Sequence, residues 1–127
     1  MATLSTAARI RNRIKASESD ISDAVLTEFI ADEQAYIEGY SKKVFAESDS
    51  QFALARSVCT DRCAAKALLH IVGISAGIIY SIDELKIDKS DRAATKLSMA
   101  RDIWDRAKEQ LLLLKPASSL RPRSSTA

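Results

Sequence analysis

Residues that interrupt helices are scarce in this sequence. Its 127 positions include only three glycines and two prolines, whereas alanine and leucine, which favour helix, are abundant. The sequence has no run of about 18 apolar residues that could span a bilayer, and its N-terminus has no apolar core typical of a signal peptide. We therefore expect a helical protein that is made in the cytoplasm, where its two cysteines stay reduced.

Groups suited to catalysis are also few. The single histidine, His70, falls among Leu68, Leu69 and Ile71 in a predicted helix, with no evident partner or cleft for a general base. The sequence contains no phosphate-binding loop and no nucleophile motif. We expect no catalytic residue and no enzymatic activity, and we interpret His70 as a partly buried or interfacial structural residue.

The two cysteines raise the question of a metal site. Cys59 and Cys63 are one helical turn apart, but His70 lies about 10 Å further along the helix axis. One tetrahedral ion cannot reach all three side chains, and a fourth ligand is missing. We therefore interpret the cysteines as small core residues and expect no metal and no cofactor. A metal or redox sensor that uses Cys59 and Cys63 is the alternative.

The charge is polarised along the chain, although the net charge is only +2. Residues 1–18 carry four basic side chains against Glu18, and the segment from Lys115 onward carries three basic side chains and no acidic one. The stretch between them is acidic overall. Basic ends of this kind contact phosphate groups or an acidic partner, or simply keep a protein soluble. The candidate contacts at the N-terminal end are Arg9, Arg11, Arg13 and Lys15.

Helical spacing of apolar residues predicts four helices. They cover about residues 4–15, 23–40, 50–72 and 90–114. Ser22 or Asp20 is expected to cap the second helix, Asp49 or Ser50 the third, and Ser90 the fourth. In the second helix, we predict that a broad apolar face lies inward, while acidic residues, Glu33 among them, point elsewhere.

A short β element is predicted between the last two helices. Ile78, Tyr80 and Ile82 alternate with Ile79 and a serine, and the alternation shifts after residues 83–84. This pattern indicates a hairpin at about residues 77–88 that needs a neighbour to cover it. The predicted fold is thus mainly α: a small bundle of about four helices with a β-hairpin insertion. Residues 1–115 form one domain, and residues 116–127 form a basic tail that is flexible or ordered by a partner.

Taken in order, four stretches resemble the head–tail connector or adaptor proteins of tailed phages. They are DAVLTEFIAD with YIEGY at residues 23–32 and 36–40, ALAR with AAKAL at 53–56 and 64–68, IYSIDELKID at 79–88, and the closing helix through Trp104. Together they extend over about residues 5–114. Members often carry a Thr-Gly-Arg-like turn after the second helix, where this chain has Ser41-Lys42-Lys43.

The resemblance implies a structural protein of the virion neck that is made in the host cytoplasm. It would dock as a dodecameric ring on the portal, join the capsid to the tail around the DNA channel, and bind portal, neck or tail proteins but no membrane. Expected contacts with the portal or neighbouring subunits are Leu120, Arg121, Arg123, Ile78, Tyr80 and Lys86. The N-terminal basic residues would face channel DNA, nonspecifically, or an acidic portal surface.

Two other functions remain open at this point. The basic ends also fit a DNA-associated helical regulatory protein, although no helix-turn-helix pattern is present. Another tail-completion component would show much the same sequence features as an adaptor.

Overall fold

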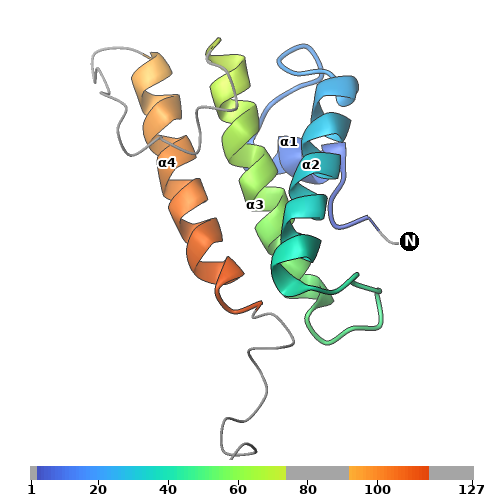
Figure 1. The fold of residues 1–127 in the computed structure, drawn as a ribbon. Helices are drawn as coiled ribbons and strands as arrows, with labels where there is room; N and C mark the ends of the chain where they lie inside the picture. The colour runs from blue at the N-terminus through green and yellow to red at the C-terminus, as the bar shows by residue number, and fades with distance from the viewer. Residues whose placement is uncertain (1–2, 74–91, 115–127) are drawn as a thin grey trace, which may run out of the picture.

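The computed structural model describes residues 3–73 and 92–114. This part of the chain forms four helices: α1 (Ala7–Ile14), α2 (Asp23–Ser41), α3 (Phe52–Ile71) and α4 (Arg92–Leu111) (Figure 1). The prediction of a mainly helical fold is confirmed. The predicted hairpin at about residues 77–88 lies outside the described residues, as does the tail at 116–127.

Side-chain caps begin the first two helices. The Thr6 hydroxyl accepts a hydrogen bond from the backbone N–H of Arg9, and the Ser22 hydroxyl accepts one from Val25. Helix α1 starts later than predicted because Leu4 precedes it in a buried position, where its backbone N–H donates to Gln34 Oε1 at 2.8 Å. Of the two caps predicted for α2, the structure selects Ser22.

Helix α3 begins without the predicted side-chain cap. Its N-terminal boundary is at Gln51, which makes no capping hydrogen bond with its side chain. Asp49 accepts instead from the backbone N–H of Ala46 at 2.8 Å and pairs with Lys43, so its carboxylate organises the preceding loop. At the other end, Gly73 follows the helix with a φ of +84°, a conformation that glycine adopts without strain.

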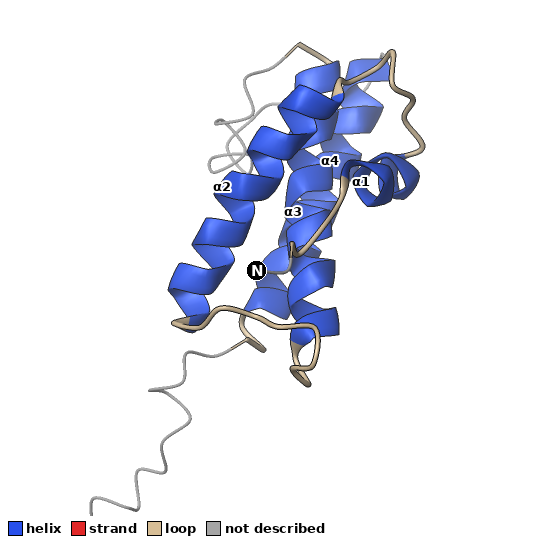
Figure 2. Ribbon diagram, turned by 90° about the vertical axis from the view of Figure 1, so that its right-hand side faces the viewer, coloured by secondary structure: helices blue, strands red, loops and turns tan. Residues whose placement is uncertain are grey.

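Helix α3 is the centre of the bundle. Figure 1 shows α3 between α2 and α4, and Figure 2 shows the short α1 lying across the longer helices. Helix α3 contacts each of the other three helices and has its most extensive contact with α4. None of the described helices is both long and apolar enough to cross a membrane.

The core contains many small side chains on α3. Its buried apolar residues are Phe52, Ala55, Val58, Cys59, Cys63, Ala64, Ala65, Ala67, Leu68 and Leu69. Small residues let neighbouring helices approach closely. Because helices surround α3 on several sides, three charged residues are buried with the apolar ones: Asp61, Arg62 and Lys66.

Candidate functional site

A cluster of buried charges joins α2 to α3. The Glu33 carboxylate on α2 accepts a hydrogen bond from Arg62 Nε at 2.5 Å and one from Lys66 Nζ at 2.7 Å. The side chain of Glu33 is 1% exposed and that of Arg62 is 2% exposed. We call Glu33, Arg62 and Lys66 the buried ion cluster. The prediction that Glu33 points away from the apolar face was wrong, because these two cations hold its carboxylate in the interior.

The cluster keeps Glu33 ionised. Burial by itself opposes ionisation, but the charge of Arg62 and the hydrogen bonds from Lys66 and Arg62 outweigh it and lower the pKa of Glu33 below its ordinary value. A carboxylate fixed by two cations is not placed to take a proton from a substrate. We therefore interpret the cluster as a structural feature that fixes how α2 lies on α3.

Arg62 also connects α2 to α4 through two aromatic rings. Its guanidinium carbon lies 4.3 Å from the ring centroid of Tyr36 on α2 and 4.2 Å from that of Trp104 on α4. Contacts of this kind are attractive, and they strengthen when water is excluded. The guanidinium Nη2 of Arg62 is buried and has no hydrogen-bond partner within the described part of the chain. Arg62 is therefore the point at which the three long helices meet.

A groove lies over Arg62 between α2 and α4. Its volume is about 650 Å³, and we call it the aromatic groove. It is lined by Tyr36, Tyr40, Arg62, Trp104, Asp105, Lys108, Glu109, Leu111 and Leu112. Tyr36 is 47% exposed and Leu112 is 61% exposed, and Leu113 beside it is equally exposed. Exposed apolar and aromatic side chains around a hollow are typical of protein contact surfaces.

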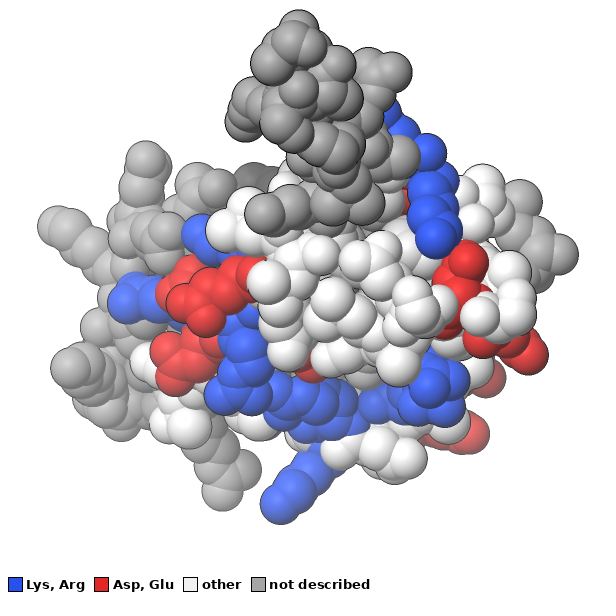
Figure 3. All heavy atoms as spheres, turned by 90° about the horizontal axis from the view of Figure 1, so that it is seen from below, with Lys and Arg blue, Asp and Glu red and all other residues white. Residues whose placement is uncertain are grey.

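A second hollow, with a volume of about 450 Å³, lies where α1, α3 and α4 meet. We call it the arginine pocket. It is lined by Arg9, Arg13, Ala53, Arg56, Ser57, Thr60, Asp61, Arg106 and Gln110. Figure 3, which views the molecule from below, shows Lys and Arg side chains forming a band across that face. The four arginines come from three helices that are far apart in sequence.

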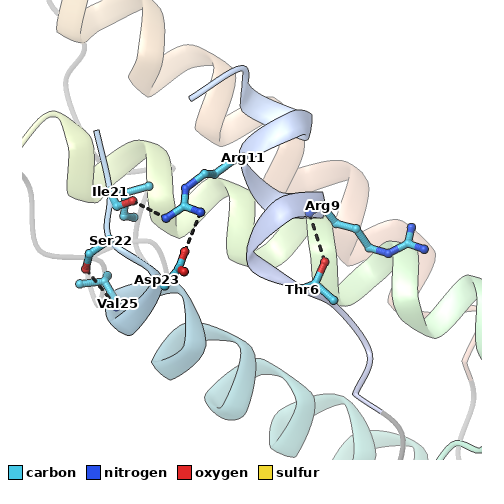
Figure 4. Close-up of polar contacts among 7 residues, drawn as sticks. All are labelled: Thr6, Arg9, Arg11, Ile21, Ser22, Asp23 and Val25. Atoms are coloured by element: carbon cyan, nitrogen blue, oxygen red, sulfur yellow. Dashed lines mark hydrogen bonds and ion pairs between the residues drawn. The ribbon is translucent and has the colours of Figure 1, made fainter. Parts of the chain in front are cut away.

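The four predicted N-terminal contacts go to different places. Arg9 and Arg13 both line the arginine pocket. Arg11 points away from Arg9 and is bound within the chain: it donates to the carbonyl of Ile21 at 2.8 Å and pairs with Asp23 at 2.6 Å (Figure 4). Lys15 ends α1 in the left-handed conformation, beside a different hollow.

The remaining predicted residues divide into two groups. Cys59 and Cys63 are buried and free, as the interpretation as core residues requires. The pKa of the Cys63 thiol is raised well above its ordinary value. The largest cause is a hydrogen bond with Cys59, and the second is burial. The expected contacts at Ile78, Tyr80, Lys86, Leu120, Arg121 and Arg123 lie outside the described residues.

His70 does not fit the expected partial burial within the chain. It is exposed, and its ring meets that of Phe29 edge-on, with 6.3 Å between the centroids. Burial at an interface with another molecule stays a prediction.

Sequence reasoning missed the residues that matter most in both sites. Arg62 and Lys66 had a usable signal, because the α3 segment is apolar on nearly every face and a helix of that kind is buried. Its charged residues must then find partners. Arg56 and Arg106 had no such signal, since only the folded chain brings them to Arg9 and Arg13.

Comparisons of this chain with known protein families, with curated proteins and with solved structures found no match.

Proposed function

We propose that this chain is a structural protein of a tailed virus, a head–tail adaptor that forms a ring on the portal and joins the capsid to the tail. The aromatic groove is the observation that carries the proposal. It gives a small helical protein an exposed aromatic and leucine surface over a cation, Arg62, whose Nη2 has no hydrogen-bond partner among residues 3–73 and 92–114. A subunit of a closed ring needs such a surface to bind its neighbour.

The contacts that join the helices at Arg62 support the same role. Arg62 joins three helices, and Glu33 fixes its position from the interior. An adaptor has to keep its shape while it bears contacts with several partners at once. In this proposal the groove receives side chains of the next copy of the chain. The protein is located in the neck of the virion.

The test is electron microscopy of lysates from the virus after deletion of this reading frame. Empty or DNA-leaking heads beside free, complete tails are expected, because a missing joint leaves both halves finished but separate. The same deletion complemented by the intact gene should restore joined particles. Normal infectious particles without the gene would overturn the adaptor proposal and favour the DNA-associated regulatory protein. Full heads with incomplete tails would favour a tail-completion component.

A further inference from the structure

The arginine pocket has more positive charge than the described residues neutralise. Arg13 pairs with the pocket's carboxylate, Asp61, through a 3.0 Å contact. Within the described part of the chain, Arg9, Arg56 and Arg106 form no ion pair. Three guanidinium groups that have no acidic partner among the described residues therefore surround one hollow.

Neutral hydrogen-bonding groups accompany these arginines. Ser57 and Thr60 on α3 and Gln110 on α4 line the same hollow. The Ser57 hydroxyl donates to Gln110 Oε1 at 3.3 Å, and the NH₂ group of Gln110 is a hydrogen-bond donor. Arginine together with serine, threonine and glutamine is the set of side chains that contacts phosphate oxygens in protein–DNA complexes.

The position of the pocket suits an extended ligand better than a single ion. Its arginines come from α1, α3 and α4, and the side chain of Asp61 is largely buried in its pair with Arg13. A series of backbone phosphates can contact several of these groups at once and release the counterions condensed on DNA. Carboxylates on a protein surface accept the same kinds of hydrogen bond, so an acidic protein is the other outcome of the test.

We infer that the arginine pocket binds the phosphate backbone of duplex DNA, without sequence preference, through Arg9, Arg56 and Arg106. This inference replaces the general expectation that N-terminal basic residues face DNA with one defined pocket that also includes Arg56 and Arg106. It holds for the isolated protein whatever its place in a virion, so its failure would leave the adaptor proposal standing. Arg13 acts as a positioning residue that keeps Asp61 neutralised. Arg11 takes no part.

The experiment measures fluorescence anisotropy of a labelled duplex of about 20 base pairs with the full chain, from about 50 to 200 mM NaCl. The test variant is Arg56→Gln/Arg106→Gln. The control is Lys42→Gln/Lys108→Gln, which removes the same charge from two exposed residues outside the pocket. The pocket variant should bind roughly tenfold or more weakly at the lowest salt, and its salt slope should shrink by about two. The control should keep the slope of the natural chain.

Far-UV circular dichroism establishes that each variant is folded. If the double variant does not fold, Arg9→Gln is used, and its salt slope should shrink by about one. No binding by the natural chain at the lowest salt would overturn the inference, as would equal effects of pocket and control variants. Pocket-dependent binding of polyglutamate without binding of the duplex would also overturn it and identify an acidic protein as the partner.

Discussion

The carboxylate of Glu33 forms ion pairs with two buried cations, Arg62 and Lys66. Removing one partner of a buried ion pair leaves an uncompensated charge, whereas replacing all the charges by apolar side chains is often neutral. The chemistry of the cluster therefore suggests a comparison between one substitution and three.

We expect Glu33→Gln to lower the free energy of unfolding by roughly 3–5 kcal/mol. The triple variant Glu33→Met/Arg62→Met/Lys66→Met should lose much less, because methionine packs well against the rings of Tyr36 and Trp104. Urea denaturation followed by the fluorescence of Trp104, the single tryptophan, measures both. A triple variant as unstable as the single one would show that shape, not charge, holds the helices together.

The lowered pKa of Glu33 predicts how stability depends on pH. Burial alone would raise the pKa of Glu33. The charges and hydrogen bonds of Arg62 and Lys66 outweigh burial, so the pKa lies below its ordinary value of 4.5. A carboxylate with a lowered pKa stabilises the fold fully above its unfolded pKa and loses that contribution as pH falls through the folded pKa.

The urea midpoint of the natural chain should therefore fall steeply below about pH 4.5. The triple methionine variant lacks this contribution, so its midpoint should fall less over the same range. Parallel curves for the two proteins would assign the acid sensitivity to other carboxylates.

Among the elements, α2 and α3 begin in different ways. Ser22 caps α2 through its side chain, whereas α3 has no side-chain cap and Ser50 makes no capping contact. Loss of a capping hydroxyl costs about 1 kcal/mol.

We expect Ser22→Ala to lower the free energy of unfolding by about 1 kcal/mol, and Ser50→Ala to change it by less than about 0.5 kcal/mol. Chemical denaturation of both variants at one pH measures the difference. Equal losses at the two positions would mean that Ser50 contributes a cap in solution.

The elements also show what the sequence could predict. Apolar periodicity located all four described helices to within a few residues, because that spacing depends only on which face is inward. Asp49 was misassigned as a cap, since a carboxylate just before a helix serves a loop equally well. Glu33 was misassigned because its partners lie on another helix, at 62 and 66, and single-helix patterning carries no information about them.

For the whole molecule, the adaptor proposal depends on the aromatic groove. Leu112 is 61% exposed in the groove wall, and Val44, outside it, is 58% exposed. Both should accept a charge without unfolding the chain, because neither contributes much to the core.

We expect Leu112→Glu to reduce the titre of a deletion virus complemented in trans by roughly tenfold or more, since a buried contact at an interface tolerates charge poorly. Val44→Glu should complement normally. Circular dichroism of the purified variants checks folding. If both variants complement fully, the groove is not a contact surface in the particle.

The central place of α3 has a consequence for synthesis on the ribosome. Among the described helices, α4 leaves the exit tunnel last, yet it supplies the largest contact with α3 and the Trp104 ring over Arg62. Until α4 emerges, a nascent chain exposes the apolar face of α3 that α4 later covers. That interval is when a chaperone would meet this protein, and when many copies translated together are most prone to aggregate.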